Sequence, residues 1–295
     1  MPQILHRKLP GDFKTLPLHV EAHEAGLRYQ SLGQPLNFEQ MLARRRPVQI
    51  DNAQRFSVEL ANLGVSVRLT LGWQGRDYWL LVRQQRRDRG DVVLKLISGY
   101  VPVQELGLPL LTAMQEVAEE CLIENADGWL AGRFADIWLP TPYQSALRYR
   151  QASHFRLLSN SGAPHPIQCG TLPLTERPHA YVHTPTASLQ LVYDLRLELP
   201  ADCQKPSLFH VDECLEDQQL VARLDRDHAD LFLLPVRQNR PDGELYTLQH
   251  GRLQPADTGD VWLAESFAAQ DGWLVRDERI AWNDWLASGN PGLIG

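Results

Sequence analysis

Apolar and polar residues occur in short blocks through the first third of the chain, a pattern typical of strands. Apolar and aromatic residues are frequent in the segments 56–60, 66–71 and 78–83. The six residues between the last two segments, 72–77, read Gly-Trp-Gln-Gly-Arg-Asp and predict a turn. Two antiparallel strands joined as a hairpin are therefore expected.

A further apolar run at 92–97 is followed by Gly99 and then by a predicted helix. A glycine directly after a strand lets the backbone approach a ligand closely. The helix is expected over 108–124, with Pro109 in its first turn, where proline is tolerated. Its apolar residues form one stripe at i, i+4, i+7 and i+11, made of Leu110, Met114, Val117 and Cys121.

Weaker signals follow along the chain. Segments 128–139 and 187–199 have the pattern of extended strands, and the second alternates as a half-buried strand does. Residues 159–185, between them, are rich in Pro, Gly, His and Thr and predict a long loop. Short helices are expected at 38–46 and 278–287.

These patterns predict a central domain with two additions. Residues 1–55 carry mixed Pro, Gly and charge and are interpreted as an N-terminal arm or small lead-in segment. The central domain is expected over 56–240, and 241–295 is expected to be a C-terminal extension packed on it. An arm of this length can cross to a partner subunit, so a homodimer is one open prediction.

Composition narrows the class of protein. The chain has 295 residues, 43% of them hydrophobic and 22% charged, which excludes a disordered tail, a fibre and a small disulfide scaffold. Acidic residues outnumber basic ones by 36 to 29, which argues against broad binding to nucleic acid. No apolar run is long enough to span a membrane, and the first residues lack the apolar core of a signal peptide. A cytoplasmic protein that binds neither nucleic acid nor membrane is expected.

Three glutamates project from the face of the predicted helix opposite its apolar stripe. Glu116, Glu119 and Glu120 lie within one turn, and their mutual repulsion is unfavourable unless a cation or solvent offsets it. Mg²⁺ or Mn²⁺ suits such a group because both ions prefer oxygen ligands. A solvated acidic helix face has the same Glu-x-x-Glu-Glu spacing, so the context has to decide between the two interpretations.

The context resembles the Nudix box. The family pattern is Gly, five residues, Glu, seven residues, then Arg-Glu-(aliphatic)-x-Glu-Glu-x-Gly-(aliphatic). Gly99 and Glu105 match the first spacing. The second half is matched by Glu116, Val117, Glu119, Glu120 and Ile123. The preceding segment, Leu-Val-Arg-Gln-Gln-Arg-Arg at 81–87, also resembles the strand that opens the family's fold.

Three departures from the pattern are specific. Nine residues instead of seven separate Glu105 from Gln115, Gln115 stands in the place of Arg, and Leu122 stands in the place of Gly. In the family, the Arg forms an ion pair that orients the helix. Glu105 therefore lacks its expected partner.

The resemblance implies an α/β fold, a Nudix-type α/β/α sandwich with a mixed sheet. By matching position, it implies that Glu116, Glu119, Glu120 and the Gly99 carbonyl bind Mg²⁺ or Mn²⁺, and that Glu119 or Glu116 activates the attacking water. The implied reaction is hydrolysis of a nucleoside diphosphate linked to another moiety, as in a nucleotide sugar or dinucleotide. The substrate is then a nucleotide-derived small molecule.

Two other interpretations stay open. The altered Gln115 and Leu122 are compatible with a non-catalytic Nudix-like module that binds a nucleotide metabolite or a protein partner. The acidic helix could instead be a plain surface of an assembly protein.

Further candidates lie outside the box. Arg83, Arg86 and Arg87 could bind phosphate oxygens, or they could form a solvated hairpin tip. Two further groups are candidates for an additional metal ligand. The first is the set of loop residues His165, Glu176, His179 and His183, and the second is the pair Asp212 and Glu213.

Overall fold

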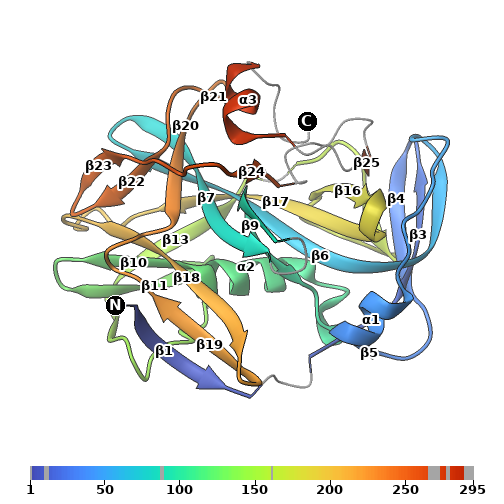
Figure 1. Ribbon diagram of the computed structural model, residues 1–295, viewed down its shortest axis with the longest axis horizontal. Coiled ribbons are helices and arrows are strands. Elements are labelled where there is room, and N and C mark those ends of the chain that lie inside the picture. Colours follow the sequence, from blue (N-terminus) through green and yellow to red (C-terminus); the bar gives the residue numbers. More distant parts are fainter. Residues whose placement is uncertain are drawn as a thin grey trace.

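The computed structural model describes residues 2–9, 13–86, 90–160, 162–264, 273–276 and 280–288 (Figure 1). Strands dominate it, and they pair in both parallel and antiparallel fashion. In the described ranges the helices α1 (Phe38–Arg44) and α3 (Trp282–Ala287) are short, and α2 (Pro109–Glu120) is the longest. The expected α/β class with a mixed sheet is confirmed.

The centre of the sheet is one long strand, β6 (Phe56–Trp73), of 18 residues. It runs parallel to β17 (Ser188–Glu198), from the pair Asn62–Ser188 to the pair Leu71–Leu197. On its other side it pairs in succession with β3 (Leu18–His23), β9 (Ile97–Tyr100) and β7 (Arg76–Arg86), all antiparallel. Its middle residues are almost continuously buried, as expected for a strand covered on both faces.

The remaining strands extend this arrangement outward. The strands that continue from β7 and β17 are β8 (Asp91–Lys95), β20 (Leu231–Arg237), β13 (Tyr149–Ser159), β16 (His179–His183) and β11 (Gly128–Phe134). A second group pairs around β10 (Cys121–Asn125): β18 (Ser207–Glu216), β19 (Gln219–Leu224) and β1 (Gln3–Lys8). The shorter strands are β2 (Lys14–Thr15), β4 (Gly26–Ser31), β5 (Leu36–Asn37), β12 (Ile137–Trp138), β14 (Ile167–Cys169), β15 (Leu172–Pro173), β21 (Arg240–Pro241), β22 (Tyr246–Gln249), β23 (Arg252–Pro255), β24 (Trp262–Leu263) and β25 (Leu274–Val275).

Helix α2 lies across the middle of the molecule and contacts β6, β9 and β18 (Figure 1). Its predicted apolar stripe is buried, with Val117 fully enclosed and Leu110 and Met114 nearly so. The three glutamates of the opposite face remain partly exposed. Burial of the stripe fixes the rotation of the helix, and the rotation fixes where the glutamates point.

The helix ends earlier than the sequence predicts. It was expected to reach residue 124, but the backbone turns extended at Cys121, with φ −116° and ψ 99°. Residues Cys121–Asn125 form strand β10 because Leu122 and Ile123 are buried by pairing with β18. The acidic turn is therefore the last turn of the helix, next to a strand end.

Other boundaries also differ from the expectation. The predicted segments 56–60 and 66–71 belong to the single strand β6, because the residues between them are also buried. The predicted loop at 159–185 contains the strands β14, β15 and β16. Helix α3 begins at Trp282, and residues 278 and 279 of the predicted helix at 278–287 lie outside the described residues.

The segments at the two ends of the sequence pack on the central strands. From residues 1–55, β1 pairs with β19 and β3 pairs with the first part of β6. From residues 241–295, Trp282 and Trp285 of α3 are buried in an apolar cluster with Leu234 and Leu263. The division at residues 55 and 240 stays a prediction.

None of the helices in the described part of the chain has the length and apolar character needed to cross a membrane.

Candidate functional site

The last turn of α2 brings two of its glutamates toward the strands that precede it. Glu116 lies against Gly99 of β9, so closely that a Cβ atom at residue 99 would overlap the Glu116 carboxylate. Gly99 pairs with Val65 of β6, which holds its backbone in place. The glycine predicted to allow a close approach therefore does so, and the group that approaches is the carboxylate of Glu116.

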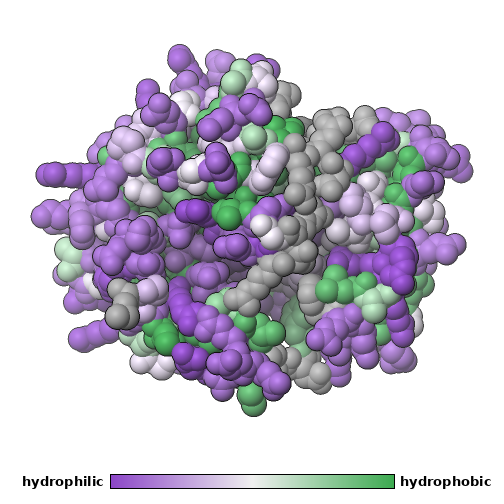
Figure 2. Space-filling view, viewed as in Figure 1, coloured by the Kyte–Doolittle hydropathy of each residue, from purple (hydrophilic) through white to green (hydrophobic). Residues whose placement is uncertain are grey.

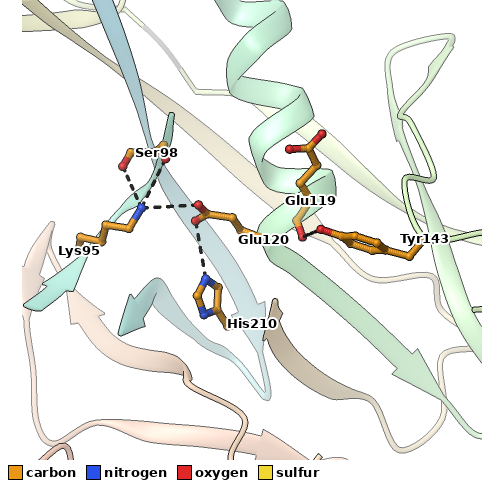
Figure 3. A network of polar contacts seen from close by, with 6 residues as sticks. All are labelled: Lys95, Ser98, Glu119, Glu120, Tyr143 and His210. Carbon is orange, nitrogen blue, oxygen red and sulfur yellow. Dashed lines mark hydrogen bonds and ion pairs between the residues drawn. The ribbon is translucent and has the colours of Figure 1, made fainter. Parts of the chain in front are cut away.

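Glu120 faces a lysine that the sequence analysis did not single out. The Lys95 Nζ atom lies 3.5 Å from Glu120 Oε1, and the two side chains point toward each other (Figure 3). Lys95 Nζ also donates to Ser98 Oγ at 3.0 Å and to the Ser98 carbonyl at 3.4 Å. The Lys95 side chain is 10% exposed, so its charge is held close to Glu120 in a poorly solvated place.

Glu119 has a different environment. Its carboxylate points away from Lys95, while its backbone carbonyl accepts a hydrogen bond from the Tyr143 hydroxyl at 3.1 Å (Figure 3). This bond satisfies one of the carbonyls that a helix leaves unpaired in its last turn. Tyr143 therefore holds the C-terminal end of α2 through the Glu119 backbone, and this bond does not involve the Glu119 carboxylate.

A fourth carboxylate comes from β18. Glu213 accepts contacts from His6 Nε2 at 3.0 Å and from Lys8 Nζ at 3.3 Å, both on β1. Its charge also acts on Glu116 and Glu119. Of the pair Asp212 and Glu213 named from the sequence, Glu213 lines the cavity beside Glu116, and the charge of Asp212 acts on Glu120. The N-terminal strand supplies the contacts to Glu213.

Burial and mutual repulsion keep protons on this cluster. Burial, then the charges of Glu120 and Glu119, raise the pKa of Glu116 to about 8. Burial also raises the pKa of Glu119 and of Glu120, and Lys95 only partly opposes the effect at Glu120. The cluster therefore carries more carboxylates than its neighbouring cations offset.

His210 of β18 also lies near Glu120. Its Nε2 atom is 3.9 Å from Glu120 Oε2, beyond hydrogen-bond distance (Figure 3). Burial, with a smaller contribution from Lys95, lowers the pKa of His210 to about 3, so the ring is neutral at pH 7. It therefore leaves the negative charge of the cluster unchanged.

A polar cavity of about 510 Å³ opens onto one part of this site. Its walls include Lys95, Gly99, Glu116 and Glu213, together with Arg86. Aromatic side chains also line it, namely Phe13, Tyr100 and Tyr181. A second cavity, of about 390 Å³, lies beside β13 and the loop after β17 and has none of these carboxylates in its wall. The described part of the molecular face in Figure 2 is mainly hydrophilic, with apolar residues in small groups.

Gln115 and Leu122, which depart from the Nudix pattern, have different surroundings. Gln115 reaches Glu105, with Nε2 3.5 Å from Oε1, and the Thr112 hydroxyl donates to the other oxygen of Glu105. An amide and a hydroxyl thus contact Glu105 where the family has an arginine. Leu122 is buried in the apolar cluster that contains Trp129 and Phe209.

The predicted arginines are divided between two places. Arg86 lines the cavity and forms a two-pronged pair with Asp91, at 2.9 Å for each bond. Arg83 is exposed, and its charge acts on Asp230 instead. Arg87 lies outside the described residues.

The predicted loop residues are placed elsewhere. The His165 ring lies 5.8 Å from that of Trp273, and His179 Nε2 is 3.5 Å from Asp194 Oδ2. His183 contacts the Thr186 hydroxyl at 2.7 Å, and Glu176 contacts Thr175. Each of the four side chains therefore contacts a partner other than the glutamates of α2.

The donor chemistry of the cluster suits a hard divalent cation. All its candidate ligands are oxygen atoms, and Glu120 Oε2 is buried without a hydrogen-bond partner. Across the described residues, however, no three His, Cys, Asp or Glu side chains are grouped in positions to hold a metal ion. Lys95 pairs with one of the oxygens that such an ion would use.

Sequence reasoning missed four residues of the site, namely Lys95, Lys8, His6 and Tyr143. Lys95 is the last residue of a strand that stops four residues before Gly99, and a lysine in an apolar run is a usable signal. No signal of this kind marks Lys8 or His6, because only the pairing of β1 with β19 brings them to the site.

The sequence gives no match to protein-family models and no match to curated proteins. Among solved structures, the chain is similar to the crystal structure of a MutT/nudix family protein from Enterococcus faecalis, with 13% sequence identity and a TM-score of 0.23. The similarity covers 66% of this chain and 59% of that one, so the chain spans less than two thirds of the length of that structure. Because the likeness is distant, function is inferred from the residues of the site.

Proposed function

We propose that the chain is a Mg²⁺- or Mn²⁺-dependent hydrolase of the Nudix type, which cleaves a phosphoric anhydride bond in a nucleoside diphosphate linked to another moiety. A nucleotide sugar or a dinucleotide is the expected class of substrate. The observation that carries the proposal is the group of four carboxylates, Glu116, Glu119, Glu120 and Glu213, of which Glu116 and Glu213 line one polar cavity. Burial and mutual repulsion raise the pKa values of Glu116, Glu119 and Glu120, and a cation would offset the repulsion.

The proposed roles follow from position. Glu116 and Glu120, with the Gly99 carbonyl, would hold the metal, and Glu119 would complete the set or act as base. A bound divalent ion polarises phosphate oxygens and lowers the pKa of a water molecule. Glu119 suits the role of base because its carboxylate points away from Lys95, as Figure 3 shows.

The cavity wall provides cationic groups for an anionic substrate. Lys95 and Arg86 both line it, and guanidinium and ammonium groups bind phosphate oxygens. Asp91 already pairs with Arg86, which fixes the guanidinium in one orientation. A phosphate in the cavity would then lie between these cations and the glutamates of α2.

The decisive experiment is an assay of nucleoside diphosphate derivatives with Mg²⁺ and with Mn²⁺, in which release of a monophosphate is measured. The comparison is between the wild type, Glu120→Gln and the control Glu24→Gln, which removes an exposed carboxylate in the turn between β3 and β4. We expect Glu120→Gln to reduce turnover by about a hundredfold or more, and Glu24→Gln to leave it unchanged. Full turnover in Glu120→Gln, or in excess chelator, would refute the proposal.

One observation favours a second candidate, a non-catalytic Nudix-like module that binds a nucleotide metabolite or a protein partner. The ion pair between Lys95 and Glu120 supplies a cation from the chain itself, so the acidic turn is partly neutralised without metal. Calorimetry separates the two candidates. Tight binding of a nucleotide without turnover across the panel favours the binding module, whereas metal-dependent turnover favours the hydrolase.

A further inference from the structure

Lys95 is the most enclosed cation of the site. It ends strand β8, its side chain is 10% exposed, and Ser98 accepts two hydrogen bonds from its ammonium group. The third contact is the ion pair with Glu120 Oε1 at 3.5 Å. An ammonium group held in this way costs free energy to bury unless its charge is compensated, and here the compensation comes from Glu120.

The same ammonium group also faces the cavity. Lys95 lines the cavity together with Glu116, which the Lys95 charge also reaches. A divalent ion bound to Glu120 would share that carboxylate with Lys95, and two cations at such short separation repel each other strongly. Ser98 cannot offset the repulsion, because its two oxygens only accept hydrogen bonds from the ammonium group.

We propose that Lys95 is an internal counter-ion that occupies Glu120 when no divalent cation is bound and is released toward the cavity when the cation binds. The released ammonium group then contacts an anionic group of the ligand, of the phosphate class. The inference rests on the proposed metal-dependent function and adds to it an order of events. Lys95 acts here as a positioning residue, because it moves between a carboxylate of the site and the ligand.

This exchange couples the two ligands of the site. The cation has to displace Lys95, so the cation alone binds more weakly than the carboxylates would allow. An anion that accepts Lys95 removes this cost, and by linkage the cation strengthens binding of the anion by the same factor.

Mn²⁺ binding provides a test that does not depend on turnover. Free Mn²⁺ is measured by electron paramagnetic resonance during titration of the wild type, Lys95→Met, Lys95→Arg and the control Lys205→Met, which removes an exposed lysine in the loop before β18. We expect Lys95→Met to bind Mn²⁺ about tenfold more tightly than the wild type, because one repelling charge is gone. Lys95→Arg and Lys205→Met should bind as the wild type does.

The outcomes separate the inference from the proposed function. Equal or weaker Mn²⁺ binding by folded Lys95→Met overturns the inference and leaves a metal-dependent hydrolase intact. Absence of Mn²⁺ binding in all four proteins overturns both. Thermal unfolding of each variant establishes that it is folded before titration.

A second measurement uses the wild-type protein alone, in case Lys95→Met does not fold. Lysines are acetylated with a limiting amount of acetic anhydride, and the extent at each lysine is read by mass spectrometry. We expect Mn²⁺ to increase acetylation of Lys95 and to leave that of Lys205 unchanged. Unchanged or reduced acetylation of Lys95 at saturating Mn²⁺ would contradict the release of its ammonium group.

Discussion

The carboxylate of Glu116 rests against the Cα atom of Gly99, in space that only a residue without a side chain leaves open. Strand β9 and helix α2 thereby meet at the residues expected to hold the metal. The obstacle that a Cβ atom would meet is the far end of a flexible side chain, so it would move the carboxylate and leave the backbone where it is.

Gly99→Ala should therefore impair the site more than the fold. We expect Mn²⁺ affinity to fall about tenfold or more because the Glu116 carboxylate is displaced, with a loss of stability below about 2 kcal/mol. Titration with Mn²⁺ and urea unfolding measure the two effects. The matched control is Gly107→Ala, since nothing lies near the place of its new Cβ atom. Wild-type affinity in Gly99→Ala would contradict the role given to Glu116.

The raised pKa of Glu116 makes stability depend on pH between the unfolded and the folded pKa values of this carboxyl group. In the folded protein the pKa is about 8, above the ordinary value of 4.5, so the folded state retains a proton that the unfolded state has lost. The stabilisation from this proton is full below the unfolded value and disappears as pH rises through about 8.

In metal-free buffer, the melting temperature should thus decrease as pH rises toward about 8 and level off above it, and Glu116→Gln should flatten the decrease. The His210 pKa is lowered from 6.5 to about 3, so that group makes stability rise with pH only between these values, and the interval from pH 6.5 to 8 reports on Glu116. Differential scanning calorimetry of both proteins checks the prediction. A pH dependence in Glu116→Gln as steep as in the wild type would count against the assignment.

Tyr143→Phe tests how the end of α2 is held. The variant removes the hydrogen bond to the Glu119 carbonyl and leaves that carbonyl without this donor, which should cost about 1–2 kcal/mol in unfolding free energy. Urea unfolding measures the loss. Tyr246→Phe is the control, a half-buried tyrosine on β22, and it should change stability by less than about 0.5 kcal/mol.

Glu119→Gln separates chemistry from metal binding. If Glu119 acts as base, turnover should drop about a hundredfold or more, whereas Mn²⁺ affinity should change far less than in Glu120→Gln. The pH profile of turnover in the wild type should rise with pH on its acidic side, since the base has to be deprotonated and its pKa is raised. A loss of affinity equal to that of Glu120→Gln would instead make Glu119 a metal ligand only.

Periodicity in the sequence predicts the parts of the fold that depend on local pattern. The apolar stripe of α2 is buried as expected, and the hairpin of β6 and β7 turns at the predicted residues. The predicted end of α2 was wrong by four residues. Helix and strand compete at 121–124, and pairing with β18 decides in favour of the strand. Such pairing depends on residues far along the chain, which local pattern does not contain.

The same limit applies to the site. The group of Glu116, Glu119 and Glu120 follows from spacing on one helix, so the sequence reveals it. Their partners come from other strands, with Lys95 on β8 and Glu213 on β18. The order of strands in the sheet brings them together, and that order cannot be read from the local pattern of a single sequence.

The long strand β6 has a consequence for the time course of folding. Its parallel partner β17 lies far away in the chain, as the ion pair between Arg68 and Asp194 illustrates, because these residues are 126 positions apart. Closing so large a loop costs entropy before any contact is gained, so proteins built on such pairings fold slowly. During synthesis, β6 must wait for residues 188–197, and Glu213 is made later still. A nascent chain therefore exposes the apolar residues of β6 until most of the protein has been made, which makes β6 a candidate site for chaperone binding.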